Sequence, residues 1–150
     1  MSVCLLDTSI LCEILEVPGR CDHKTEVLAA LEGKVKERES LLLPMSAIVE
    51  AGNHIGQNGD GRQRREAAGR FVSLVQQAIR GETPFTPTPF FETEALLEWL
   101  AHFPDWAMRG SGLADLTIAK EFERQCALHR QRSVYIWSLD GHLSSYRREP

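Results

Sequence analysis

The sequence has few of the features that mark secreted, zinc-binding or membrane-spanning proteins. Its four cysteines form no C-x-x-C pair, and no histidines follow them at zinc-finger spacing. We therefore expect neither a disulfide framework nor a structural zinc site. No run approaches the ~20 apolar residues of a membrane span, and the first residues lack the basic start and long apolar run of a signal peptide. These absences predict a cytoplasmic protein with reduced thiols and no membrane association.

An excess of positive charge is also lacking. The chain has 17 Lys and Arg against 21 Asp and Glu, a formal net charge of -4, whereas nucleic-acid-binding domains are usually basic. If four of the acids surround bound cations, however, the remaining acids balance the bases, and the cations mask the acidic excess from an approaching phosphate. The net charge therefore does not exclude RNA as a partner.

Linkers, repeats and low-complexity tracts are absent as well. With 150 residues, of which 43% are hydrophobic, the chain is long enough to bury its own core. The clearest loop signals are the glycine-rich segment 56–61 and the proline-rich segment 83–89. We expect a single domain spanning residues 1–150.

Short apolar runs alternate with stretches of helical periodicity. Val3 to Leu6 predicts a buried strand, and Asp7 then offers N-cap chemistry for a helix through about Leu15. Further strands are expected at 41–43, 85–86 and 134–137, and further helices at 22–38, from Ser46 as its cap through Glu50, at 62–80, 92–101 and 112–131, with 102–111 as an aromatic-rich loop. Strands joined through helices predict a parallel sheet covered on both faces, a three-layer α/β fold.

Four acids fall at positions that this topology brings together. Asp7 and Asp140 follow the first and last strands, and Asp115 and Glu50 lie near the beginnings of two helices. Ligand sites in such sheets form outside the carboxyl ends of the strands. Two carboxylates about 4 Å apart repel by roughly 4 kcal/mol at an effective dielectric near 20, so a cluster takes up protons or divalent cations. Oxygen ligands alone favour Mg²⁺ or Mn²⁺ over zinc.

Each acid alone has a simpler explanation. Asp7 suits a helix cap, Asp115 a charge favoured by a helix N-terminus, Glu50 a solvated helix residue, and Asp140 a turn. A turn or packing role is favoured for His142 over contact with a substrate. Two further groups stay open between nucleic-acid contact and ordinary surface or packing roles: Arg62, Arg64, Arg65 and Arg70, and Trp99, Phe103 and Trp106.

The segments around the four acids resemble the motifs of PIN-domain nucleases, in the same order along the chain. They are Leu5-Leu6-Asp7-Thr8-Ser9, Ser46-Ala47-Ile48-Val49-Glu50, Gly112-Leu113-Ala114-Asp115-Leu116-Thr117-Ile118-Ala119 and Trp137-Ser138-Leu139-Asp140-Gly141-His142-Leu143. The resemblance implies a PIN-like central parallel sheet of four to five strands, with Asp7 at its centre and helices on both faces. Only ten residues follow Asp140, so the fifth strand is expected to be short or missing.

The resemblance also implies an Mg²⁺- or Mn²⁺-dependent endoribonuclease. Asp7, Asp115 and Asp140 are then direct metal ligands, and Glu50 is a ligand or orients the attacking water. Water bound to a cation serves as the nucleophile in this chemistry, so no covalent nucleophile is required. Three hydroxyls that adjoin these acids are candidates for hydrogen bonds to a carboxylate or to a metal-bound water, namely those of Thr8, Ser9 and Ser138.

Among PIN proteins, the motifs are most similar to VapC-type toxins of toxin-antitoxin pairs. That similarity implies an RNA substrate and a small antitoxin-type protein that inserts a basic side chain among the four carboxylates, and it is compatible with a homodimer. An apolar anchor for the partner is expected near Leu11, Ile14 and Leu15, or in segment 103–106.

Two other classes of protein share parts of this pattern. An α/β phosphatase or phosphotransferase is disfavoured, because Asp7 is followed by Thr8-Ser9-Ile10 with no second aspartate two residues on. A PIN domain kept as a non-catalytic RNA- or protein-binding module is the remaining alternative. Loss of a site acid would indicate it, and all four acids are present.

Overall fold

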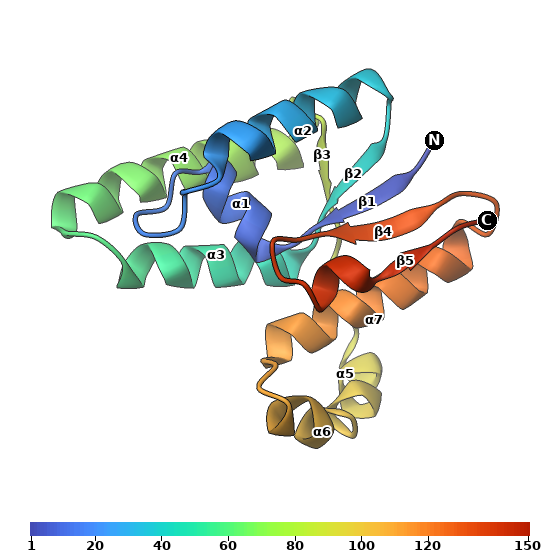
Figure 1. Ribbon diagram of the computed structural model, residues 1–150. Coiled ribbons are helices and arrows are strands. Elements are labelled where there is room, and N and C mark those ends of the chain that lie inside the picture. The colour runs from blue at the N-terminus through green and yellow to red at the C-terminus, as the bar shows by residue number, and fades with distance from the viewer.

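A five-stranded sheet organises the chain, and the computed structural model describes all 150 residues (Figure 1). The strand order is β3-β2-β1-β4-β5, with β1 at the centre. The first four strands run parallel, and β5 pairs antiparallel to β4 at the edge. The strands are β1 (Val3–Leu6), β2 (Ser40–Leu43), β3 (Phe85–Pro87), β4 (Val134–Trp137) and β5 (Arg147–Arg148).

Helices cover both faces of this sheet. Figure 1 shows α1 to α4 on one side and α7 on the other, with α5 and α6 beyond α7. The helices are α1 (Thr8–Ile14), α2 (Lys24–Lys36), α3 (Met45–Gln57), α4 (Gly61–Ile79), α5 (Thr93–Leu100), α6 (Phe103–Met108) and α7 (Leu113–Leu128), with a short 3₁₀ helix η1 (Leu143–Ser145) before β5. No helix has both the length and the apolar character that crossing a bilayer requires.

The central strand shows why the fold has three layers. Every residue of β1 is fully buried, and successive side chains point to opposite faces of a strand. Cys4 and Leu6 belong to the larger core cluster, beneath α1 to α4, whereas Val3 and Leu5 pack in a second cluster with Ile118 of α7. A continuous apolar run is therefore what this strand needs, because neither face meets water.

Most of the expected elements are confirmed. The structure has the predicted α/β arrangement, the strands at 3–6 and 134–137, and the long helix before Gly81, which adopts the left-handed backbone expected after a helix end (φ +74°).

Several expectations were wrong. Segment 102–111 contains the helix α6, which begins with Pro104 in its first turn, where proline's fixed φ suits a helix. Ser46 does not cap α3, because Pro44 holds that position and accepts the backbone N–H groups of Ala47 and Ile48. The fifth strand is short, as expected, but it pairs antiparallel to β4, so the sheet is not wholly parallel. Leu11 and Leu15, expected at an exposed partner surface, are buried under the neighbouring helices.

Candidate four-carboxylate site

The carboxyl ends of β1 and β4 create the site. Leu6 of β1 pairs with Trp137 of β4, so the next residue on each strand, Asp7 and Ser138, emerges at the same edge of the sheet. The backbone N–H of Asp7 donates to the carbonyl of Trp137 (3.0 Å), which fixes this junction. The strand ends therefore deliver Asp7 and the segment leading to Asp140 into one place.

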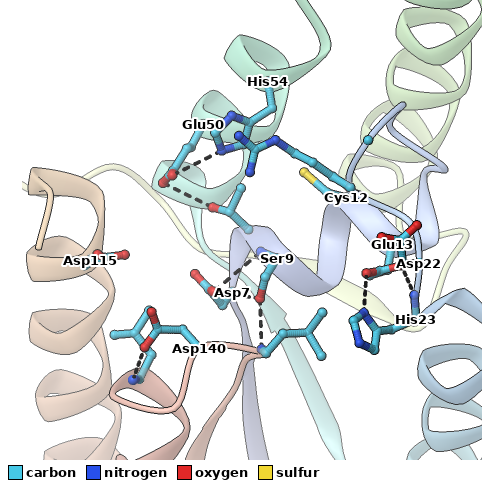
Figure 2. A pocket seen from close by; sticks show the side chains of 15 residues that line it. Asp7, Ser9, Cys12, Glu13, Asp22, His23, Glu50, His54, Asp115 and Asp140 are labelled. Atoms are coloured by element: carbon cyan, nitrogen blue, oxygen red, sulfur yellow. Dashed lines mark hydrogen bonds and ion pairs between the residues drawn. The ribbon is translucent and has the colours of Figure 1, made fainter. Parts of the chain in front are cut away.

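A cavity of about 350 Å³ opens at this edge. Glu50 reaches it from α3 and Asp115 from the first turn of α7, so four separate segments of the chain contribute acids. Figure 2 shows Asp7 with Glu50, Asp115 and Asp140 around it. The structure thus brings together all four acids singled out in the sequence, which line the cavity as Asp7, Glu50, Asp115 and Asp140.

Asp7 is buried, with an exposed fraction of 7%, and is held by three donors. One carboxylate oxygen accepts the hydroxyls of Ser9 (2.9 Å) and Ser138 (2.7 Å) and a long hydrogen bond from the backbone N–H of Ser9 (3.5 Å). Asp7 is also the N-cap of α1. The simple helix-cap explanation is therefore correct, and it accounts for one side of the carboxylate only.

Asp140 and Asp115, like Asp7, each have one carboxylate oxygen that accepts hydrogen bonds from the protein. One oxygen of Asp140 accepts the backbone N–H groups of His142 (2.7 Å) and Leu143 (3.1 Å), as in an ordinary turn. One oxygen of Asp115 accepts a weak hydrogen bond from the N–H of Gly112 (3.4 Å), which closes the beginning of α7. In Asp7, Asp115 and Asp140 alike, the second oxygen has no hydrogen bond from the protein.

Glu50 is fixed from both of its oxygens. Thr8 donates its hydroxyl to one oxygen (3.3 Å), and Nε2 of His54, one helical turn further along α3, lies 3.4 Å from the other. Hydrogen bonds between three hydroxyls and the site carboxylates were predicted from the sequence. The structure shows such a bond for each of Thr8, Ser9 and Ser138. The hydroxyls orient the acids without neutralising them.

The acids influence one another electrostatically. Burial raises the pKa of Asp115, and the negative charges of Asp7, Glu50 and Asp140 raise it further, while the hydrogen bond from Gly112 lowers it. Ionised Asp115 is thus less favourable here than in water. A bound cation would remove this penalty.

The donor set suits a hard divalent cation. All four side chains offer oxygen, and each aspartate keeps one oxygen free of protein donors, as Mg²⁺ or Mn²⁺ ligation requires. No three Asp, Glu, His or Cys side chains converge into a preformed metal cage. The acids therefore line an open cavity, with Asp7, Asp115 and Asp140 as the residues able to hold a cation and Glu50 beside them.

A second wall of the cavity was missed in the sequence. It comes from the end of α1 and the following loop, and Figure 2 shows Glu13, Asp22 and His23 together there, apart from the first four acids. Glu13 is almost fully buried (3% exposed) and accepts the backbone N–H of His23 (3.0 Å), which ties the loop back to α1. Arg20 lies in the same loop and also lines the cavity. The only signal for this wall was the Pro18-Gly19 turn.

Cys12 lines the cavity as a buried residue and is no nucleophile. Burial raises the pKa of its thiol to about 11, with Arg20 lowering it and Glu50, Asp7 and Glu13 raising it. The thiol therefore stays protonated at neutral pH, and a thiolate is what attacks in cysteine catalysis.

The other candidates from the sequence lie outside this cavity, and all but Arg65 among the arginines have structural partners. Arg62 pairs with Glu66, Arg64 donates to the carbonyl of Gly59, and Arg70 donates to the carbonyls that end α1. His142 packs its ring against Trp106 and Tyr146. These contacts favour the packing roles over contact with a substrate.

Comparison with known proteins adds no relative. No family model matches the chain, and no curated protein or solved structure is significantly similar to it.

Proposed function

We propose that this protein is a metal-dependent endoribonuclease of the PIN type, using Mg²⁺ or Mn²⁺ held by Asp7, Asp115 and Asp140. One observation carries the proposal. Four carboxylates from four distant segments line one cavity at the carboxyl ends of the central strands, and three keep an oxygen free of protein donors. The resemblance of the four motifs to PIN nucleases gives the same residues in the same order.

The protein's own groups prepare this cavity for hydrolysis of a phosphodiester. Ser9 and Ser138 hold one oxygen of Asp7 and so aim the other oxygen outward. The turn at His142 and Leu143 does the same for Asp140. A bound divalent cation supplies acidification of water and stabilisation of charge on the phosphate. Rigid placement of the ligands before the substrate arrives is what such sites require.

Glu50 is the acid best placed to handle the attacking water. It is partly exposed and lines the cavity from α3, with Thr8 and His54 fixing its orientation. In the proposed reaction a carboxylate oxygen of Glu50 accepts the proton of the water whose oxygen attacks phosphorus. The bond between phosphorus and the leaving ester oxygen then breaks, and that oxygen takes up a proton from solvent.

We extend the proposal to the toxin of a cytoplasmic toxin-antitoxin pair, on the resemblance to VapC-type proteins. An arginine of a small partner could pair two carboxylate oxygens of the cavity at once and so exclude the metal. The excess of acids around the cavity supports a basic partner group. Isolation of the native complex, followed by Mn²⁺ titration of partner binding, tests this extension, because metal and partner should compete.

The main experiment measures cleavage of single-stranded and structured RNAs with Mn²⁺, Mg²⁺ or excess EDTA. The proteins compared are the wild type and the single variants Asp7→Asn, Glu50→Gln, Asp115→Asn and Asp140→Asn. We expect cleavage that EDTA abolishes and that each substitution strongly reduces. RNA binding without cleavage by the wild type under any metal condition would instead favour the non-catalytic binding module.

A further inference from the structure

One arginine stands out among the acids of the cavity. Arg20 is the sole Lys or Arg that lines it, whereas six carboxylates do so. The Arg20 side chain is exposed and forms no ion pair and no hydrogen bond within the protein. Because arginines near carboxylates normally pair with them, an unpaired guanidinium in this setting is available to a ligand.

The backbone that carries Arg20 is well held. Arg20 N–H donates to the carbonyl of Val17 (2.9 Å), closing a tight turn over Pro18 and Gly19, and Gly19 has a φ of +77°. This is the Pro-Gly pattern of a type II turn, in which only glycine adopts the positive φ without strain. The turn therefore places Arg20 at a defined point on the rim of the cavity.

Contacts from distant segments fix the turn to the fold. Arg70 of α4 donates to the carbonyls of Leu15 (2.8 Å) and Glu16 (3.0 Å), just before the turn. At the junction of α3 and α4, a Cβ at Gly59 would lie 3.1 Å from Cβ of Pro18, so the two segments approach closely. Arg20 is therefore carried by a braced loop, while its own side chain has no structural duty.

Arg20 lines the same cavity as the acids that suit a metal. Its charge, like those of Glu50, Asp7 and Glu13, acts on the buried thiol of Cys12. A polyanionic substrate entering here meets strong repulsion from the carboxylates, and the guanidinium is the one permanent positive charge in the cavity wall.

We infer that Arg20 binds a phosphate of the RNA backbone and holds it beside the carboxylate site. The inference rests on the proposed ribonuclease function and adds to it a substrate-binding residue. The planar guanidinium donates two parallel hydrogen bonds to phosphate oxygens, a geometry that an ammonium group does not provide. Arg20 thereby determines which phosphate of the RNA strand lies beside the carboxylates.

Binding and cleavage are measured separately to test this. Arg20→Gln, Arg20→Lys and Arg65→Gln are compared, the last as a matched control because Arg65 is exposed, has no ion pair or side-chain hydrogen bond and lies outside the cavity. Binding of a fluorescent single-stranded RNA with Mn²⁺ is followed by anisotropy at several salt concentrations, in an Asp140→Asn background that blocks cleavage. Steady-state cleavage is then measured without that background substitution.

Arg20→Gln should weaken binding roughly tenfold to a hundredfold, as expected for loss of a charge-assisted pair. It should also reduce the slope of log affinity against log salt by about 0.7, the value for one phosphate on a single strand. Arg20→Lys should restore the slope but only part of the affinity, and Arg65→Gln should change neither. In cleavage, KM should rise more than kcat falls.

Equal affinity and salt slope for Arg20→Gln and Arg65→Gln would overturn the inference, and so would a wild-type protein that does not bind RNA. If RNA binding depends on Arg20 but the protein cleaves no RNA, the inference about Arg20 stands and the proposed nuclease activity is refuted. The exposed Arg20 side chain forms no hydrogen bond or ion pair in the protein, so loss of its charge from among the acids should lower the melting temperature only slightly. That measurement separates lost binding from lost folding.

Discussion

Asp7→Asn should separate the chemistry of the site from the stability of the fold. Asp7 has two roles in the structure, since one oxygen caps α1 and receives two hydroxyls while the other is left for a ligand. Asparagine caps helices about as well as aspartate, so its side-chain oxygen can keep the first role. The second role is lost, because an amide nitrogen at the other position cannot ligate a cation.

The magnitudes follow from these contacts. Hydrogen bonds to a charged group contribute about 1.5–3 kcal/mol and neutral ones about 0.5–1.5 kcal/mol, so weakening the Ser9 and Ser138 bonds costs roughly 2 kcal/mol. Removing one charge from a cluster of four acids relieves repulsion and raises the free energy of unfolding by a similar amount. The free energy of unfolding without metal should therefore change by less than about 1 kcal/mol, whereas kcat should fall by at least about 10²-fold.

The assay pairs RNA cleavage in Mn²⁺ with urea unfolding in EDTA. Asp60→Asn is a matched control, because Asp60 is the N-cap of α4, accepts the N–H of Gln63 (2.8 Å) and lies outside the cavity. Asp7→Ala is the second comparison and should cost at least about 1 kcal/mol more than Asp7→Asn, because it loses the cap and both hydroxyl hydrogen bonds. Turnover of Asp7→Asn within threefold of wild type would refute the reasoning, as would equal losses of activity in the Asp7 and Asp60 variants.

Three further predictions concern the charges and hydroxyls of the same site. The pKa of Asp115 is higher in the folded protein than in the unfolded chain, where it is about 3.9. Ionisation of Asp115 therefore lowers the stability of the fold as the pH rises from the unfolded pKa through the folded pKa. Asp115→Asn should for this reason raise the metal-free melting temperature by roughly 1–4 °C at pH 7.5. That gain should vanish as the pH approaches 4, and a gain independent of pH would contradict the charge explanation. Mn²⁺ at about 100 times its dissociation constant should stabilise the wild type by about 2.7 kcal/mol, which raises the melting temperature by roughly 5–10 °C. The increase should be smaller for Asp140→Asn. Identical increases in both proteins would place the ion elsewhere. Ser138→Ala should reduce kcat/KM about 10-fold to 100-fold, because Asp7 loses a hydrogen bond that fixes its orientation. Ser144→Ala, which removes only a hydroxyl bonded to the carbonyl of Gly141, should have no effect. Equal rates for the two variants would argue against the orienting role of Ser138.

The sequence predicted those parts of the molecule that depend on local pattern. The apolar run Val3–Leu6 sufficed for the central strand, and the acids after the strands and near helix beginnings sufficed for one wall of the cavity. Parallel pairing brings strand ends to one edge whatever the loops do. Asp7 and Asp140 could therefore be grouped from the sequence, together with Glu50 and Asp115 from helices that begin near the same edge.

The rest depends on contacts between distant residues. The loop that carries Arg20 is held by Arg70 and Gly59, more than thirty residues further along the chain, and no local pattern encodes those contacts. Strand β5 has only two residues, paired through Arg147 and Arg148, too few for an alternating pattern. Helix α6 has six residues rich in aromatics and proline, a composition that favours a loop until packing against α7 is known.

Crystals soaked in Mn²⁺ and measured for anomalous scattering would test the central claim most directly. The account predicts an anomalous peak in the cavity, at bonding distance from oxygens of Asp7 and at least one of Asp115 and Asp140, on the carboxylate sides that lack protein hydrogen bonds. The peak should disappear in Asp7→Asn. Well-ordered acids with no peak between them, or a peak confined to Glu13, Asp22 and His23 on the opposite wall, would contradict it.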